Sequence, residues 1–483
     1  MKFKLSREEW IIVLLALGAY IVCLVNDFHT DDWIVLSFIR DGFSLSDLAS
    51  MENVGRFRPL TNIIVWFRYL AFGDTAYLYY ILNIVLHAVI SVLFYRLLLK
   101  LEFPKRAALI SALFFAVYFQ HYEAVIWLYG TIRELAVLAY IFSIWHLHGY
   151  LKTKSKISFL FFVLFSFLGL FVVEDFVVAP LLFGLFVLLF GENSDRSRIV
   201  KRVVLIGLVE LIIYFAIRSV IIDRPGITET YYYPGFHMIR MLFEYMGWFV
   251  IPSPTHPYFQ GFADSLPSPV YYLWRGISYL AVGSFLPLSV WLFIKSPKQV
   301  RFFILFVFVV MLPIIPLNYK VGSRNIYIPS LGLAVMAGYT LNLFLSKSTI
   351  KERLRKMVLI AAACYMAVSV AAVTVTSSEY RKTQLLVSGI IDDLRDTGID
   401  LNNSDCVLLD NLPGRTVVGP SMIYRLDFKR YLIASNDPVK GPIDIATAAD
   451  SLYNLNKSFV VFVYRDGRMV EATKEYILRK GSP

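Results

Sequence analysis

The sequence predicts an all-α polytopic membrane protein with about eleven transmembrane helices, followed by a small C-terminal α/β domain. Hydrophobic residues make up 57% of the 483 residues and charged residues only 17%, well below the charged share of soluble proteins. Apolar runs suited to cross ~30 Å of hydrocarbon, which takes about 20 residues, recur as far as residue 376. The net charge of +11 does not indicate nucleic-acid binding, because the cations cluster in short loops between the spans.

The apolar runs predict eleven spans, and the loops between them predict the orientation. Loops assigned to the inside are rich in Lys and Arg, whereas the other loops hold most of the acidic groups. Because basic residues gather on the cytoplasmic side, we expect a cytoplasmic N-terminus and an extracytoplasmic C-terminus. The expected spans are residues 10–26, 76–99, 107–119, 134–151, 157–173, 176–191, 203–221, 270–294, 300–318, 326–345 and 357–376.

Three apolar stretches are predicted not to cross. Residues 32–39 and 59–72 have apolar residues at helical spacing but are flanked or interrupted by arginines, which favours helices lying on the membrane surface. Residues 238–251 are assigned to an interfacial or re-entrant helix. If they crossed, the basic loop Lys295-Ser296-Pro297-Lys298 would lie outside, against the charge pattern of every earlier loop.

The chain divides into a membrane domain, residues 1–376, and a tail, residues 377–483. The tail carries no nucleophile motif, Gly-rich phosphate loop or metal-ligand spacing, which favours a packing or partner-binding module. The three cysteines, Cys23, Cys364 and Cys406, imply no disulfide framework. In the tail we expect helices at 378–397 and 444–454, strands at 406–409 and 459–464, and a hairpin turn at Arg465-Asp466-Gly467-Arg468.

The segment Asn26 to Trp33 is the first candidate for chemistry. Asp31 and Asp32 follow the first apolar run directly, and carboxylates at a membrane boundary that face protein are usually functional. The alternative is a solvated loop start that merely ends a helix.

Further charged groups fall in loops that the predicted topology places on the same side. Together they suit group transfer with a phosphate leaving group, because a carboxylate accepts the acceptor's proton and an arginine stabilises phosphate oxygens. Each group also has a structural alternative. Glu123 would simply end a short helix, Glu174 and Asp175 would form a tight polar turn between two spans, and Arg324 would extend its side chain to the membrane surface. His29 and His121 with carboxylates leave a divalent metal open, but no two-histidine helical spacing supports one. The charged residues are Glu123, Arg133, Glu134, Glu174, Asp175 and Arg324.

Six segments between residues 28 and 340 together resemble motifs of one family. They are Phe28-His29-Thr30-Asp31-Asp32, Arg58-Pro59-Leu60-Thr61, Asn83 with His87, His121-Tyr122-Glu123-Ala124-Val125-Ile126-Trp127, Glu174 with Pro180, and Ser323-Arg324-Asn325-Ile326-Tyr327-Ile328-Pro329-Ser330. In this order they resemble the membrane part of the transmembrane-and-tetratricopeptide O-mannosyltransferases and their prokaryotic relatives, which are GT-C glycosyltransferases.

The chain departs from the family pattern at several positions. The acidic residue after the tryptophan is shifted to Glu134, Val173 replaces a lysine, and Ser323 replaces a glutamate. We expect no tetratricopeptide repeats, because the short tail stands in their place. These departures concern the identity of sugar and acceptor more than the type of reaction.

The resemblance implies a GT-C-like fold and an inverting glycosyltransferase that uses a polyprenyl-phosphate sugar as donor. Asp31 or Asp32 would deprotonate the acceptor hydroxyl, and Arg324 would hold the lipid phosphate. GT-C enzymes differ in metal dependence, so no metal ligand is assigned. We expect a bacterial inner membrane, with a protein or glycan acceptor. The residues expected to bind substrate are Arg58, Glu123, Arg133, Glu134, Glu174, Asp175, Arg324 and Tyr327.

Two other functions compete with this interpretation. A lipid or solute transporter, or flippase, would need ionisable groups near mid-membrane and a repeat relating its halves. A non-catalytic scaffold protein would depend on the tail and tolerate changes of the carboxylates. The charged groups are predicted at one face of the membrane, which favours the transferase.

Overall fold

The structure is a computed structural model that divides into two compact units. The first unit contains Met1–Leu24 and Ser44–Ser377, and the second contains Val25–Phe43 and Ser378–Pro483. The segment after the first helix therefore groups with the C-terminal residues. The structure describes residues 5–28, 30–40, 57–222, 234–252, 257–317, 322–347, 351–398, 406–410, 431–434, 436–437, 441–442, 458–465 and 468–478.

The first unit is a bundle of helices with short 3₁₀ turns (η) between them. Its first half contains α1 (Arg7–Tyr20), η1 (Ile21–Val25), α4 (Pro59–Phe72), α5 (Ala76–Lys100), α6 (Lys105–Val117), η2 (Phe119–His121), α7 (Tyr122–Val125), η3 (Leu128–Gly130), α8 (Thr131–Thr153), α9 (Lys156–Val172), η4 (Glu174–Val178), α10 (Ala179–Phe190) and α11 (Arg196–Ile221). Its second half contains α13 (His237–Val250), α14 (Pro257–Asp264), α15 (Ser268–Lys295), α16 (Lys298–Met311), η5 (Ser323–Ile326) and α17 (Ser330–Ser346).

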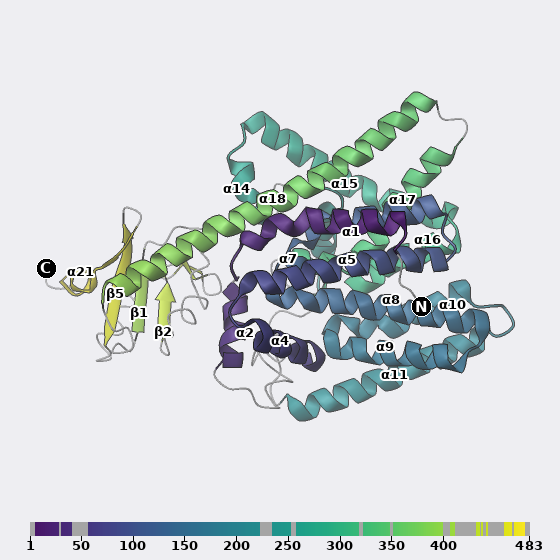
Figure 1. Cartoon of the computed structure of the whole chain (residues 1–483), viewed down its shortest axis with the longest axis horizontal. Helices are drawn as coiled ribbons and strands as arrows, with labels where there is room; N and C mark the ends of the chain where they lie inside the picture. Colours follow the sequence, from purple (N-terminus) through teal and green to yellow (C-terminus); the bar gives the residue numbers. More distant parts are fainter. Residues whose placement is uncertain are drawn as a thin grey trace. The chain divides into compact units, whose positions relative to one another are not determined.

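The long helices pack side by side in a regular succession. In Figure 1, α1, α5, α8, α9 and α11 lie beside one another in that order, and each pair of neighbours is in contact. Helices α6, α16 and α17 form a second packed group, with α17 between the other two. Large aromatic side chains fill the interior; the ring of Tyr140, for example, packs against those of Phe176 and Phe306.

Local sequence signals explain where several helices begin. Ser6 and Glu9 form a capping box at the start of α1, with each side chain bonded to the other residue's backbone N–H. Pro59 stands in the first turn of α4 and Pro180 in that of α10, where a missing N–H removes no helical hydrogen bond.

The chain is a multi-pass membrane protein. Among the described residues, six helices are long and apolar enough to cross a membrane, or seven if the bent pair Lys105–Val117 and Phe119–Val125 is one span. The two helices of this pair meet at a bend of 48° at residue 118, inside the predicted span 107–119. Helices α9 and α17 have 17 residues each, α16 has 14 and α10 has 12, shorter than a straight span of about 20 residues. The count of eleven therefore stays a prediction.

The second unit combines the segment after α1 with a small sheet. Its sheet has the order β2-β1-β5-β6, in which β1 is parallel to β2 and β5, and β6 is antiparallel to β5 (Figure 1). Both predicted strands are confirmed. Arg465 pairs with Arg468, as the predicted hairpin requires, and residues 466–467 of the turn lie outside the described residues. The elements are α2 (Thr30–Arg40), β1 (Cys406–Asp410), β2 (Tyr431–Ala434), β3 (Asn436–Asp437), β4 (Gly441–Pro442), β5 (Phe459–Arg465), β6 (Arg468–Glu471) and α21 (Thr473–Leu478).

One helix differs from the prediction. The separate helices expected at 357–376 and 378–397 are a single helix of 45 residues, α18 (Glu352–Asp396). The junction contains Thr and Ser but no Pro or Gly, and the Thr374 and Thr376 hydroxyls bond to carbonyls four residues earlier without ending the helix. The helix predicted at 444–454 lies outside the described residues.

A close helix approach gives a first testable prediction. A methyl group on Gly338 of α17 would lie 2.6 Å from the backbone nitrogen of Ser111 in α6, so Gly338→Ala must push the two helices apart. Overpacking typically costs about 1–3 kcal/mol. We expect a lower midpoint of thermal unfolding for the purified protein in detergent.

Gly276→Ala in α15 is the matched control, because a methyl group there meets nothing within 4 Å. Alanine favours helix over glycine by about 1 kcal/mol, so this variant should unfold at the wild-type temperature or above. Equal stability of the two variants would contradict the close contact of α6 and α17.

Candidate functional site

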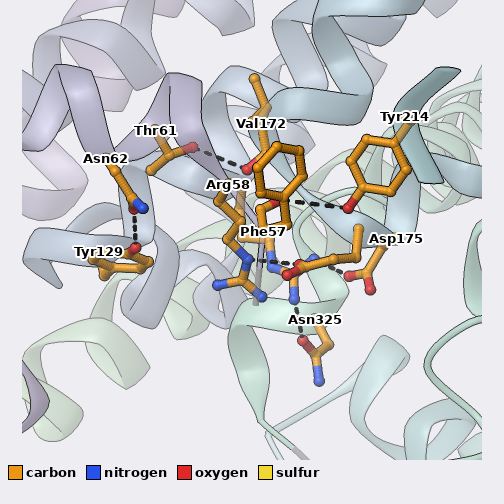
Figure 2. A network of polar contacts seen from close by, with 11 residues as sticks. Phe57, Arg58, Thr61, Asn62, Tyr129, Val172, Asp175, Tyr214 and Asn325 are labelled. Atoms are coloured by element: carbon orange, nitrogen blue, oxygen red, sulfur yellow. Dashed lines mark hydrogen bonds and ion pairs between the residues drawn. The ribbon is translucent and has the colours of Figure 1, made fainter. Parts of the chain in front are cut away.

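The first part of the site is an ion pair between Arg58 and Glu174. Arg58 directly precedes α4, and Glu174 begins the short turn η4 after α9. The Arg58 Nε lies 2.6 Å from Glu174 Oε2, and the two side chains are 12% and 29% exposed. The Thr61 hydroxyl donates to the Val172 carbonyl at 2.9 Å (Figure 2). The start of α4 is therefore held against the end of α9.

Arg133 is the centre of the second part. It lies in the first turn of α8 and donates from one nitrogen to the Asp175 carboxylate and from another to Asn325 Oδ1, the latter at 2.7 Å (Figure 2). The Asn325 amide then donates to the Tyr245 hydroxyl of α13 at 2.9 Å. One buried guanidinium thus connects α8, η4, η5 and, through Asn325, α13.

Glu123 fixes the segment that carries Arg324. Its Oε2 accepts the backbone N–H of Arg324 at 2.8 Å, and Glu123 is only 8% exposed. The Arg324 guanidinium lies over the indole ring of Trp127, 4.6 Å from the ring centroid. A cation over an aromatic face is held by the ring quadrupole, so both the backbone and the side chain of Arg324 are placed.

Two buried histidines hold the other end of this segment. His87 contacts the Tyr327 hydroxyl with Nδ1 at 2.8 Å and the Ala116 carbonyl with Nε2 at 3.1 Å. Because a carbonyl only accepts, Nε2 carries the proton and Nδ1 accepts from Tyr327. His121 Nε2 lies 2.7 Å from the Ser330 hydroxyl. The motif from Ser323 to Ser330 is therefore fixed at both ends.

The structure brings most of the predicted residues into these contacts, but not all. Glu134 is fully buried in the first turn of α8, and neither of its carboxylate oxygens has a hydrogen-bond partner among the described residues. Asp31 and Asp32 lie in the first turn of α2, in the second unit, and Asp32 is fully buried.

No group of three or more His, Cys, Asp or Glu side chains gathers as metal ligands in the described part of the chain. His121, one of the two histidines considered for a metal, bonds to Ser330 instead. His29, the other, lies outside the described residues.

Three residues of this network were missed from the sequence. Asn325 and Trp127 lie within two of the family-like segments, residues 323–330 and 121–127, so their place in these segments was the available signal. Tyr245 had none, because it lies in the apolar stretch 238–251, and only the folded structure brings it to Asn325.

Fold and site together define a polytopic membrane protein with a network of partly buried ion pairs at its helix breaks. No model of a known protein family matches the chain. The chain is similar to protein O-mannosyl-transferase TMTC3 of Mus musculus, with 32% identity over 132 residues. This match covers 27% of the chain and 14% of the mouse protein.

Among solved structures, the chain resembles ArnT from Cupriavidus metallidurans, whose crystal structure has undecaprenyl phosphate bound. The TM-score is 0.54 at 13% sequence identity, and the match covers 99% of this chain and 96% of that one. ArnT has the GT-C fold. The chain therefore has a GT-C fold, and the fold that the motifs implied is confirmed.

The Arg58–Glu174 ion pair gives a second prediction. Either Arg58→Met or Glu174→Gln leaves a largely buried charge without its partner, whereas the double variant removes both charges. We expect the double variant to lose less stability than the sum of the singles, with a coupling of about 1–3 kcal/mol. Thermal unfolding of the four proteins in one detergent measures this coupling.

The control cycle uses Arg465 and Glu475, whose side chains are 43% and 48% exposed and 2.5 Å apart. Exposed pairs contribute only about 0–1 kcal/mol. A coupling at Arg58–Glu174 no larger than in this control cycle would contradict the buried pair.

Proposed function

We propose that this protein is a membrane glycosyltransferase that moves a sugar from a polyprenyl-phosphate donor to an acceptor hydroxyl on the extracytoplasmic face, with inversion at the anomeric carbon. The fold match to ArnT over 99% of the chain carries this proposal. The ArnT crystal structure holds undecaprenyl phosphate, and the mouse relative is an O-mannosyl-transferase.

The placement of Arg324 supports a phosphate ligand at this residue. Its backbone N–H is held by Glu123, and its guanidinium lies over the ring of Trp127. A planar guanidinium suits the oxygens of a lipid phosphate, on which negative charge builds up as the bond to the sugar breaks.

The acidic pair of α2 supports the role of general base. In the proposed step, Asp31 or Asp32 accepts the proton of the acceptor hydroxyl, and the acceptor oxygen forms a bond to the anomeric carbon. The bond from that carbon to the phosphate oxygen breaks, and its electron pair leaves with the polyprenyl phosphate. Glu123, Glu174 and the groups around Arg133 orient the sugar or the acceptor.

A transporter or flippase is the second candidate, and one observation favours it. Glu210 lies near the middle of α11, is 5% exposed, and accepts a hydrogen bond from the Ser166 hydroxyl of α9 at 2.6 Å. Intramembrane carboxylates often belong to transport pathways. Movement of a labelled polyprenyl-phosphate sugar across the bilayer of vesicles that contain the protein, without transfer of the sugar to an acceptor, would support this function.

The acidic pair gives the third prediction. Asp31→Asn with Asp32→Asn removes both proton acceptors, so we expect loss of sugar transfer by at least about 100-fold while the protein still inserts and purifies. The assay uses purified protein in native lipid extract with a panel of radiolabelled polyprenyl-phosphate sugars, which also identifies the sugar.

Asp74→Asn is its control, because Asp74 is an exposed carboxylate in the loop between α4 and α5 and should leave transfer unchanged. Full activity in the double variant would exclude the acidic pair as base. No transfer by the wild-type protein from any donor would overturn the transferase itself.

Arg324 gives the fourth prediction. Arg324→Met removes the cation, and Arg324→Lys keeps the charge but loses the planar fork. We expect transfer to fall for both, more steeply for Arg324→Met, and binding of polyprenyl phosphate to weaken in the same order. Arg275→Met, which removes an arginine that lies over Tyr279 within its own helix, should retain both properties. Unchanged lipid binding in Arg324→Met would exclude the phosphate role.

A further inference from the structure

Within the second unit, side chains of α18 form hydrogen bonds to the backbone just before the acidic pair, Asp31 and Asp32. The carboxamide of Gln384 makes two hydrogen bonds to Asp27: Oε1 accepts the Asp27 N–H at 3.0 Å, and Nε2 donates to the Asp27 carbonyl. One turn earlier on the same helix, Arg381 donates to the Val25 carbonyl. Two side chains of α18 therefore hold the main chain of residues 25–27.

These contacts satisfy backbone groups that no helix or strand satisfies. Residues 26–28 lie between η1 and α2 and belong to neither, so their N–H and C=O groups need partners from elsewhere. A glutamine carboxamide carries both a donor nitrogen and an acceptor oxygen, so it can bond to the N–H and the C=O of the same residue. Gln384 thus pairs with Asp27 in the manner of a neighbouring strand.

Two short-range contacts connect Asp27 and Phe28 to α2. The Asp27 carboxylate accepts the N–H of Phe28 at 2.8 Å, and the Phe28 ring packs edge-to-face against Trp33, with centroids 5.3 Å apart. Phe28 is only 3% exposed. Since Trp33 directly follows Asp32 in α2, these contacts connect Asp27 and Phe28 to the turn that carries Asp31 and Asp32.

The helix that provides Gln384 is itself fixed. One to three turns further along, α18 buries apolar side chains against the sheet, in one cluster with Val407 and Leu409 of β1 and Val460 and Phe462 of β5. The α18 members of this cluster are Val387, Ile390, Ile391 and Leu394. The sheet therefore holds α18 in place, and α18 holds the segment that leads into Asp31 and Asp32.

We propose that Gln384 is a positioning residue for the acidic pair, so that the C-terminal domain is part of the catalytic apparatus and not a separate partner-binding module. This inference rests on the proposed transferase function. Small displacements of a reacting group can lower a rate by about 100-fold, so a base on a loosened segment should slow the chemical step while donor binding is unchanged.

The test compares Gln384→Ala and Gln384→Glu with Lys382→Ala. The alanine variant loses both bonds to Asp27, and the glutamate variant keeps only an acceptor. Lys382 lies on the same helix, is 68% exposed, and pairs only with Glu379 of α18 among the contacts described, so its loss should change nothing. We expect kcat for sugar transfer to fall about 10- to 100-fold in Gln384→Ala and less in Gln384→Glu, with KM for the polyprenyl-phosphate sugar within about twofold.

Hydrogen–deuterium exchange gives a readout that does not depend on activity. In the full-length protein, peptides covering residues 25–28 should exchange faster in Gln384→Ala than in wild type, because the Asp27 N–H loses its acceptor. They should stay protected in Lys382→Ala. Faster exchange together with the selective fall in kcat supports the inference.

Three outcomes would overturn it. Faster exchange with an unchanged kcat makes Gln384 a structural contact only, and unchanged exchange means that the bond to Asp27 is absent. A wild-type protein that transfers no sugar from any donor overturns the proposed function, and the catalytic purpose of Gln384 with it. In that case, hydrogen–deuterium exchange still shows separately whether Gln384 holds Asp27.

Discussion

The Arg133 guanidinium is the constraint on which the membrane unit depends. A buried charge without partners is strongly destabilising. The Asp175 carboxylate compensates the charge of Arg133, and the Asn325 amide oxygen accepts a further hydrogen bond from it. These partners stand in turns 42 and 192 residues further along the chain. The elements that carry these residues must therefore be packed together before both bonds can form.

The same constraint explains why so many polar side chains meet where helices break. Where little water reaches, backbone groups freed by a turn must find partners within the protein. Glu123 takes the N–H of Arg324, and Thr61 takes the carbonyl of Val172. The side chains that satisfy these backbone groups also position charged residues, so the same side chains serve the fold and the proposed chemistry.

The sequence predicts the helices well and their contacts poorly. Apolar runs and the residues flanking the Arg465–Arg468 turn are local signals, and they predicted many of the helices and both strands that the structure contains. The loop charges predict an orientation, which stays a prediction. The continuity of α18 was missed because a Thr/Ser run resembles a boundary. The pairing of Arg133 with Asp175 could not be predicted, since each residue is a plausible helix end alone. Tyr245 gave no signal because its hydroxyl acquires a role only through Asn325.

The bond between Gln384 and Asp27 also bears on the order of biosynthesis. The two residues are 357 positions apart, and ribosomes add about 5–20 residues per second, so Asp27 leaves the ribosome roughly 20–70 s before Gln384. Through that interval the acidic segment lacks the helix that holds it. A chain that has not yet reached Gln384 lacks the hydrogen bonds that hold Asp27, and synthesis of this part of α18 is the step that supplies them.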